Sequence, residues 1–368
     1  MNRRKFLRTG ALAGGAGTLA APAVLAQAPL VMKMQTSWSA SNIWQEFAKD
    51  YTDRVMAMSG GRLQIDLLPA GAVVAAFQVL DGVNDGVIDA AHSVPAYWYG
   101  KNKAASLFGT GPVFGGSATT LLSWFHEGGG KEFYDELIQD IMGLDIDGYL
   151  GSPMFAQPLG WFKTEVNSTD DIQGLKYRTV GLAADLMQAM GMSVAQLPGG
   201  EIVPAMERGV IDAFEFNNPS SDKDFGAQDV AKQYYLSSYH QASECFEFLF
   251  SRMFMEDLDP DLRAIVIHAV EAASTANTAK SMRRYSADLQ WLQNEAGVTV
   301  HRTPKEILDA QLAAWDTLIP ELEKDEFMKR VLDSQRAWVE QVAYFELMAS
   351  PDYALAYEHH FPGKLKLG

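Results

Sequence analysis

The sequence has a single cysteine, relatively few basic residues and no long apolar run after residue 25, and each scarcity excludes a class of protein. Cys245 has no second cysteine to pair with, so no intrachain disulfide can form and the apolar core must hold the fold alone. Lysine and arginine number 30 against 46 acidic residues, which gives a formal net charge of -16. This acidity argues against nucleic-acid binding and against electrostatic adhesion to anionic lipids.

The N-terminal residues predict export. Arg3 and Arg4 precede Lys5 in a twin-arginine pattern, and a run of small and apolar residues follows at 11–25. Small residues at the cleavage positions predict removal of residues 1–26 as a signal peptide, which would place the mature chain in the periplasm. The alternative is an uncleaved membrane anchor, for which the apolar run is short.

The remaining chain is long enough for two domains with apolar interiors, and its patterns predict an α/β fold. Alternating residues predict strands near the N-terminus, and apolar periodicity predicts a mostly helical last third. The expected strands and helices of this first part and of the tail are 31–36 (strand), 41–58 (helix), 62–68 (strand), 77–84 (helix), 261–294 (helix) and a further helical run from 303 through 348.

One pentapeptide occurs twice. Residues 86–90 and 209–213 both read GVIDA, and in both places a predicted helix ends at the glycine and a buried strand is expected to begin. The repeat therefore predicts two lobes that share one local architecture. Ligands of open α/β sheets bind beyond the carboxyl ends of strands, so the residues after each repeat are expected to face one crevice.

Residues 174–219 are the most informative segment. Here the patterns predict strand 175–179, helix 182–190, strand 194–197, a helix ending at Arg208 and an apolar strand 210–214. Arg178 stands at the end of one strand and Glu215 follows another. We expect them on opposite walls of a single cleft that receives a small carboxylate.

The same segment resembles the DctP-type solute-binding proteins of tripartite (TRAP) transporters. Its GLKYR, QLPGGE and GVIDAFE motifs match the family pattern, and further similarity at 96–101 and 239–251 extends the resemblance over nearly all the mature chain. The resemblance implies an α/β, two-lobed, type II-like periplasmic binding protein with hinge strands and long C-terminal helices. The function implied is capture of a small organic acid and its delivery to membrane subunits, without catalysis.

Arg178 is the first candidate for substrate binding. A guanidinium presents a planar fork of donors that matches a carboxylate with two parallel hydrogen bonds. The alternative is an arginine held in a structural ion pair. Tyr97, Tyr99, Gln157 and Asn217 are the other substrate-binding candidates. The two tyrosines are expected on one face by alternation, or in the core, and Asn217 either binds the substrate or makes a turn before Pro219.

The resemblance also implies a cation bound beside the substrate. Its ligands would be Gln157, Glu215, Gln241 and the main-chain carbonyl of Phe216, a set of oxygens that suits Na⁺ or Ca²⁺. Phe216 replaces the tryptophan common in the family, which leaves the carbonyl but removes an indole N–H. Gln157 and Gln241 can also be read as ordinary polar residues between lobes.

The predicted organisation has lobe I at 27–154 and about 244–283, lobe II at 155–243 and about 284–312, and a C-terminal helical region at 313–368. The resemblance implies partners in the small and large integral membrane subunits of a TRAP transporter, and a homodimer formed by C-terminal helix exchange, with 353–360 as the exchanged tail. The favoured substrates are 2-oxo or 2-hydroxy monocarboxylates such as pyruvate or lactate. The rival functions are a metal-dependent hydrolase or lyase using Glu215 as base, and a receptor that feeds a membrane sensor kinase.

Overall fold

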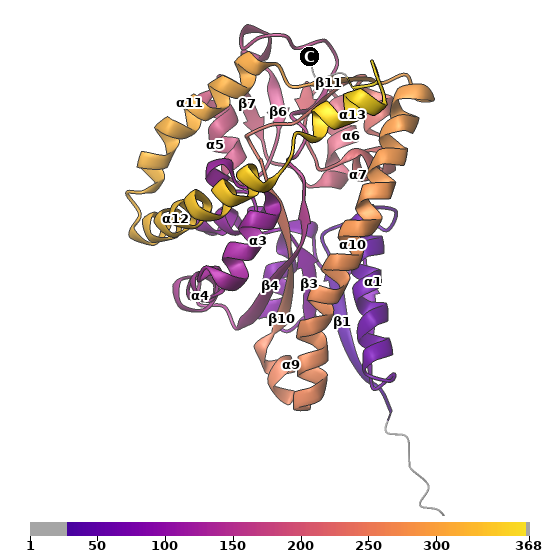
Figure 1. Cartoon of the computed structure of the whole chain (residues 1–368). Coiled ribbons are helices and arrows are strands. Elements are labelled where there is room, and N and C mark those ends of the chain that lie inside the picture. The colour runs from indigo at the N-terminus through magenta and orange to yellow at the C-terminus, as the bar shows by residue number, and fades with distance from the viewer. Residues whose placement is uncertain (1–27, 366–368) are drawn as a thin grey trace, which may run out of the picture.

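The computed structural model describes residues 28–365, which form two sheets with helices packed around them (Figure 1). The arrangement confirms the predicted mixed α/β, two-lobed architecture. The predicted signal peptide lies outside the described residues. Within the described part of the chain, no helix combines the length and apolarity needed to cross a membrane.

The first sheet contains five strands in the order β2-β1-β3-β10-β4. The strands β2, β1 and β3 run parallel, whereas β10 is antiparallel to both of its neighbours. The bounds are β1 (Leu30–Thr36), β2 (Leu63–Leu68), β3 (Ala90–Ser93), β4 (Ile146–Met154) and β10 (Glu244–Ser251). Every residue of β10 is buried, so this strand forms the centre of the lobe.

The second sheet contains six strands in the order β11-β9-β5-β8-β6-β7. Within it, β6 runs parallel to both β7 and β8, and β5 is antiparallel to β8 and β9. The bounds are β5 (Gly160–Phe162), β6 (Lys176–Arg178), β7 (Ser193–Ala195), β8 (Ala213–Phe214), β9 (Gln233–Leu236) and β11 (Thr299–Arg302).

The α-helices occupy the connections and the C-terminal third. Their bounds are α1 (Ile43–Met58), α2 (Val79–Asn84), α3 (Ala118–Glu127), α4 (Gly130–Asp135), α5 (Leu182–Ala189), α6 (Gly199–Glu207), α7 (Pro219–Asp224), α8 (Ala227–Val230), α9 (Arg252–Asp257), α10 (Pro260–Asn294), α11 (Lys305–Leu322), α12 (Glu326–Ala349) and α13 (Tyr353–His360). Short helical turns and a π-helix supplement them at η1 (Ala76–Gln78), η2 (Pro95–Trp98), η3 (Lys103–Phe108), η4 (Val113–Gly115), η5 (Glu136–Ile141) and η6 (Asp170–Ile172).

The two GVIDA copies form a turn followed by a short strand, one in each sheet. Gly86 and Gly209 both adopt a φ of 68°, a left-handed conformation that favours glycine. The predicted strand at 210–214 is too long, because Val210 is 52% exposed and β8 starts only at Ala213. The turn first buries Ile211 and only then places the chain in the sheet.

The chain passes between the sheets at residues 155–159, at 237–243 and along α10. Figure 1 shows α10 running from beside α9, past α1, to α7, and residue contacts link it to α1, to β4 and to α7. Ser152, near the end of β4, and Ser237, directly after β9, have positive φ values of 50° and 71°. Non-glycine residues seldom adopt this conformation, and it redirects the chain where it leaves each sheet.

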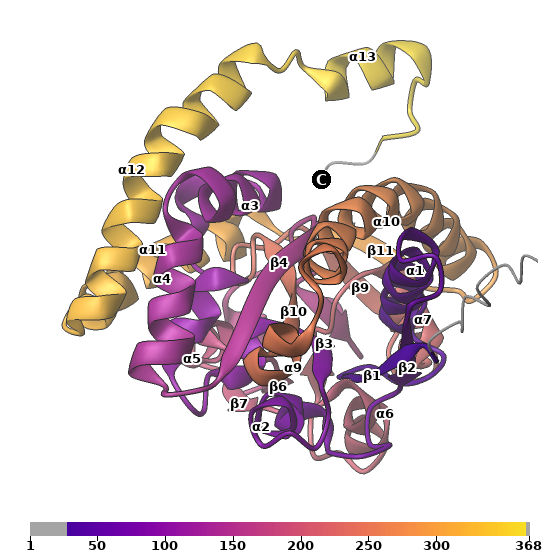
Figure 2. The same cartoon turned by 90° about the horizontal axis from the view of Figure 1, so that it is seen from below.

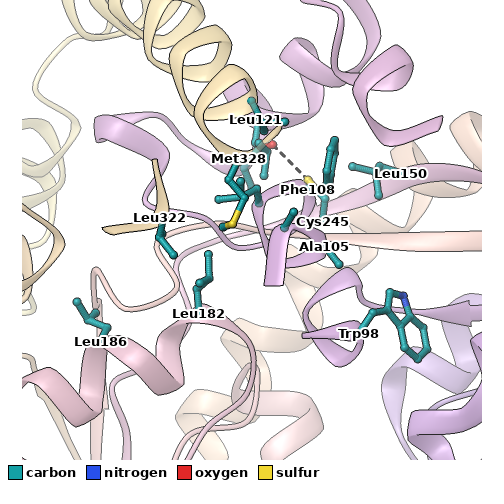
Figure 3. Close-up of a cluster of buried hydrophobic side chains, with 14 of the residues drawn as sticks. Trp98, Ala105, Phe108, Leu121, Leu150, Leu182, Leu186, Cys245, Leu322 and Met328 are labelled. Carbon is teal, nitrogen blue, oxygen red and sulfur yellow. Dashed lines mark hydrogen bonds between the residues drawn. The ribbon is translucent and has the colours of Figure 1, made fainter. Parts of the chain in front are cut away.

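The helices α11 and α12 pack across both lobes: α11 contacts α5, and α12 contacts α3 and η4. Leu322 and Met328 from this pair join Leu182 and Leu186 of α5 in one apolar cluster that also contains Phe108 and Cys245 (Figure 3). The end of α12 and all of α13 then curve away from the body (Figure 2). Large apolar side chains remain exposed there, at Tyr344, Phe345, Leu347, Met348, Tyr353, Leu355 and Phe361.

Candidate functional site

A small cavity lies between the two sheets. It offers about 10 Å³ to the centre of a water-sized sphere, which is room for one water molecule or one ion. A carboxylate with a carbon tail therefore needs the lining to move apart as it enters. The lining combines aromatic, amide and charged side chains from both lobes: Trp38, Val94, Tyr97, Gln157, Arg178, Val180, Phe216, Asn217 and Glu244.

Arg178 and Glu215 form an ion pair on one side of this cavity. Nη1 of Arg178 donates to Oε1 of Glu215 at 2.9 Å and to the main-chain oxygen of the same residue at 2.9 Å. The side chains are 1% and 0% exposed. The expectation that they stand on opposite walls is wrong, because β6 and β8 are adjacent parallel strands whose carboxyl ends meet at one edge of the second sheet.

The ion pair does not exhaust the hydrogen-bonding capacity of either partner. Nε of Arg178 donates to the main-chain oxygen of Leu197 at 2.8 Å, but Nη2 is buried without a hydrogen-bond partner among residues 28–365. The same holds for Oε2 of Glu215. Buried polar atoms are normally paired, so an unpaired donor beside an unpaired acceptor favours a bound ligand at this position.

The two glutamines predicted to hold a cation stand in the two crossing segments. The main-chain N–H of Gln157 donates to the main-chain oxygen of Gln241 at 2.9 Å, and Nε2 of Gln241 donates to Val180 at 3.2 Å. In both side chains Oε1 is buried and lacks a partner in the described part of the chain. Three of the four proposed cation ligands therefore present a buried oxygen that has no hydrogen-bond partner within residues 28–365.

These donors fit a hard cation. Carboxylate and amide oxygens are the ligands that Na⁺ and Ca²⁺ take in proteins, whereas zinc favours histidine and cysteine. Within residues 28–365, no group of three histidine, cysteine, aspartate or glutamate side chains is placed to hold a metal ion. A cation here would rely on Gln157, Glu215, Gln241 and the carbonyl of Phe216, with oxygens of the substrate completing its shell.

Phe216 and Tyr97 contribute aromatic walls. The Phe216 ring lies 5.5 Å from the Arg178 guanidinium carbon, a cation–π distance, and is 7% exposed. Tyr97 packs against Trp38 with ring centroids 5.9 Å apart. Burial raises the pKa of Tyr97, and the positive charge of Arg178 offsets part of that rise. Its phenol therefore stays protonated near neutral pH and is available as a donor.

Tyr99 does not join the site. The expectation that Tyr97 and Tyr99 share one face is wrong, because residues 95–98 form a 3₁₀-helix, in which side chains two positions apart diverge. The Tyr99 hydroxyl instead donates to Oδ1 of Asp185 at 2.7 Å, and Lys103 reaches the other oxygen at 3.0 Å. This cluster links η2 and η3 to α5 of the second lobe, outside the cavity lining.

Asn217 lines the cavity, but neighbouring side chains already engage its amide. Oδ1 accepts from Nε1 of Trp44 at 2.6 Å and from Nδ2 of Asn218 at 2.5 Å. The predicted turn role falls to the next residue: Oδ1 of Asn218 accepts from the main-chain N–H groups of Ser220 and Ser221 and caps α7.

Glu244 is a charged cavity residue that sequence reasoning missed. It begins β10, is 2% exposed, and its Oε2 accepts from Nε2 of Gln157 at 2.7 Å and from Nδ2 of Asn217 at 2.6 Å. A signal was present in the sequence ECFEFLF at 244–250, because an acidic residue in an apolar strand needs a buried partner. Val94 and Val180 were likewise not among the predicted site residues, whereas the sequence offered Trp38 as a weaker candidate.

The site carries two carboxyl groups and one guanidinium. Burial raises the pKa of Glu215 to about 7 against the lowering effect of Arg178. Burial and the negative charge of Glu215 together raise the pKa of Glu244 to about 8. Two such groups cannot both ionise at low cost beside one arginine, so a bound cation would favour their charged forms.

Residues 34–325 match the DctP family, described as bacterial extracellular solute-binding protein, family 7. The chain belongs to this family. Membership establishes a solute-binding receptor that acts outside the cytoplasm, and it confirms the resemblance carried by residues 174–219.

The chain is also similar to individual proteins whose ligands are known. The chain is 29% identical to the monocarboxylate 2-oxoacid-binding periplasmic protein of Nostoc sp. (strain PCC 7120), over 93% of this chain and 95% of that protein. A TRAP periplasmic solute-binding protein of Colwellia psychrerythraea, solved with bound calcium and pyruvate, superposes with a TM-score of 0.81 at 30% identity, covering 90% of this chain and 100% of that one. The corresponding protein of Pseudoalteromonas atlantica, with bound sodium and pyruvate, gives a TM-score of 0.81 at 28% identity, covering 90% and 99%.

Proposed function

We propose that this DctP-family protein is the periplasmic receptor of a TRAP transporter and binds a small 2-oxo or 2-hydroxy monocarboxylate, such as pyruvate or lactate, together with Na⁺ or Ca²⁺. One observation carries the proposal: Arg178, which lines the cavity, has a buried Nη2 without a partner within residues 28–365, and three buried oxygens, of Gln157, Glu215 and Gln241, also lack partners there. The donor serves the substrate carboxylate, and the oxygens serve the cation.

The relatives support the choice of substrate. One is named for 2-oxo acids, and two were solved with pyruvate beside calcium or sodium. A 2-oxo acid offers a carboxylate and an adjacent oxygen, which together complete the shell of a cation held by amide and carboxylate oxygens. Trp38, Tyr97 and Phe216 line a cavity with room for one water molecule or one ion, so a short carbon tail requires the least movement of the lining.

We further propose that lobe I comprises 27–154 and about 244–283, and lobe II 155–243 and about 284–312. The division is supported by the strands, since β1–β4 and β10 share one sheet and β5–β9 and β11 share the other. Substrate capture then closes one lobe on the other about the crossing segments. The closed form is what the small and large membrane subunits of the transporter would recognise.

The test is thermal unfolding of the mature protein after chelator treatment, with pyruvate, lactate or succinate, each with and without added Na⁺ or Ca²⁺. Ligand at about 100 times its dissociation constant adds about 2.7 kcal/mol, hence a rise of a few degrees in the midpoint. A rise with a monocarboxylate that depends on the cation is expected. A rise with succinate alone, or none with any acid, would contradict the proposed substrate.

The rival function, an enzyme, differs from a receptor in whether the bound acid is converted to product. We propose no catalysis, so pyruvate or lactate incubated with the protein and Ca²⁺ should be recovered unchanged, one molecule for each chain, in NMR spectra. Turnover of the acid would favour a hydrolase or lyase that uses Glu215. A receptor for a membrane sensor kinase is the remaining rival, and reconstituted uptake with the two TRAP membrane subunits distinguishes it.

We also propose that the exposed end of α12 and α13 is covered by a second copy of the chain. Phe345, Leu347 and Met348 are 70%, 74% and 70% exposed, and Leu355 is 70% exposed. Patches of this kind mark interaction sites. The wild-type protein should sediment as a dimer and the double variant Leu347→Glu, Leu355→Glu as a monomer. A monomeric wild-type protein would refute the exchange of C-terminal helices.

A further inference from the structure

Glu244 makes contacts that the substrate and cation roles above leave unexplained. Oε2 accepts two hydrogen bonds, at 2.7 Å from Nε2 of Gln157 and at 2.6 Å from Nδ2 of Asn217. Its donors belong to a crossing segment and to the second lobe, whereas Glu244 itself starts β10 in the first sheet. One buried oxygen thus joins three parts of the chain.

The contact with Gln157 determines which end of that amide faces the rest of the site. Because Nε2 is committed to Glu244, the acceptor end, Oε1, is left unpaired and buried. An amide has one acceptor end and one donor end, and only the oxygen can bind a cation. A glutamine free to rotate would present its N–H groups in half of its orientations.

The contact with Asn217 extends this series of hydrogen bonds to α1 of the first lobe. Nδ2 donates to Glu244, and Oδ1 accepts from Nε1 of Trp44 at 2.6 Å, in α1. Asn217 is therefore held by two residues of the first lobe, although it follows β8 in the second. Its amide orientation is fixed by the same carboxyl group that orients Gln157.

We propose that Glu244 is a positioning residue for the cation site: it orients the Gln157 amide so that Oε1 points to the cation, and it ties that orientation to lobe closure through Asn217. The inference rests on the proposed function, because it assumes the cation that Gln157, Glu215, Gln241 and Phe216 would hold. Groups that orient a metal ligand in this way commonly contribute 10–100-fold to metal affinity.

Two substitutions separate orientation from charge. Glu244→Gln keeps one oxygen able to accept both hydrogen bonds and replaces the other oxygen with an uncharged NH2 group, whereas Glu244→Leu removes the acceptor. Glu247→Gln and Glu247→Leu are matched controls three residues along β10. Glu247 is 0% exposed and also accepts two hydrogen bonds, from Nε1 of Trp98 and from the Tyr134 hydroxyl at 2.6 Å, but it does not line the cavity.

The measurement is calorimetric titration of Ca²⁺ into chelator-treated protein at a fixed, saturating pyruvate concentration, with the unfolding midpoint of each cation-free protein as the structural reference. Affinity for Ca²⁺ is expected to fall about 10–100-fold in Glu244→Leu and to stay near wild type in Glu244→Gln. Both Glu247 variants should keep wild-type Ca²⁺ affinity whatever their unfolding midpoints.

Three outcomes would overturn the proposal. Unchanged Ca²⁺ affinity in Glu244→Leu would give Glu244 a purely structural role. An equal loss in Glu244→Gln would show that its charge acts on the cation directly. Loss in the Glu247 variants would show that any buried acid of β10 matters equally. Failure of the proposed function is distinguishable, because it is seen in the wild-type protein as an absence of pyruvate and Ca²⁺ binding.

Discussion

The two GVIDA segments can be compared atom by atom. In the first lobe the main-chain N–H of Asp89 donates to Lys33 at 2.8 Å, and its carboxylate accepts from the N–H of the same lysine at 2.7 Å. In the second lobe Asp212 makes the same two contacts with Lys176, at 2.7 and 3.2 Å. The exposed valines and buried isoleucines also correspond. The identical sequence therefore forms the same local structure beside both sheets. We call this structure, the glycine turn with its aspartate–lysine contacts, the frame.

The residues that follow the frame differ in charge. His92 and Glu215 each stand two positions after the repeat, and Gln35 and Arg178 each stand two positions after the lysine. Gln35 uses its amide within its own lobe, accepting from Val73 at 2.8 Å and donating to Val74 at 2.8 Å. Within residues 28–365, Nη2 of Arg178 and Oε2 of Glu215 lack hydrogen-bond partners, and so does the buried Nε2 of His92. The frame is therefore structural, and in the second lobe a buried ion pair between Arg178 and Glu215 stands beside it.

The largest expected effect breaks this asymmetry. Arg178→Met leaves Glu215 buried without its partner and should lower the free energy of unfolding of the cation-free protein by about 3–5 kcal/mol. Gln35→Met, at the matching position of the first lobe, should cost about 1–3 kcal/mol. Urea unfolding in chelator measures both. Adding Glu215→Gln to Arg178→Met should recover part of the loss, and equal losses for the two single variants would argue against the asymmetry.

A second prediction concerns pH, where the matched pair should respond with opposite signs. The pKa of Glu215 is raised to about 7 from 4.5 by burial, so the folded state binds more protons between these values and stability falls as pH rises. Burial lowers the pKa of His92 to about 3 from 6.5, so the unfolded state binds more protons and stability rises with pH across that window.

Each group contributes at most about 1.4 kcal/mol per pH unit. In chelator, Glu215→Gln should remove the share of Glu215 in the falling component between pH 4.5 and 7, to which Glu244 also contributes. His92→Gln should remove the share of His92 in the rising component between pH 3 and 6.5. Chemical unfolding at a series of pH values measures the slopes. A Glu215→Gln protein with the wild-type slope would contradict the assignment.

The smallest expected effect tests the frame itself. Gly86 and Gly209 share a φ of 68°, and a Cβ at either would meet no atom within 4 Å. The strain of a left-handed alanine is therefore the only cost, about 1–2 kcal/mol. Gly86→Ala and Gly209→Ala should lower the free energy of unfolding equally and additively. Unequal losses in denaturant unfolding would show that the lobes do not share one frame.

Much of the fold followed from local patterns. The long helix expected at 261–294 is α10, and the motifs of residues 174–219 placed Arg178 and Glu215 at strand ends. Their separation across the cleft was wrong because which strands become neighbours depends on long-range pairing, which no local pattern specifies. The prediction for Tyr99 was wrong for a local reason: residues 95–98 form a 3₁₀-helix, whereas the prediction assumed the alternating faces of a strand.

The roles assigned to the site residues remain proposals, and Glu244 shows why sequence alone falls short there. Its importance depends on two amides, Gln157 and Asn217, that lie 87 and 27 residues away along the chain. A hydrogen-bond partner at such distances leaves no periodic signal in the sequence. The position of Glu244 in an apolar strand indicated only that its carboxyl group needs a buried partner.

The thiol of Cys245, the residue after Glu244, can report how often the first lobe opens. Cys245 is 0% exposed, its Sγ contacts the main-chain oxygen of Ala118 at 3.5 Å, and burial raises its pKa. A thiol reagent reacts with it only in conformations that expose the centre of the first lobe. Because each chain has one cysteine, the rate of alkylation reports how often the first lobe opens. A ligand that makes this opening rarer slows the alkylation by the same factor.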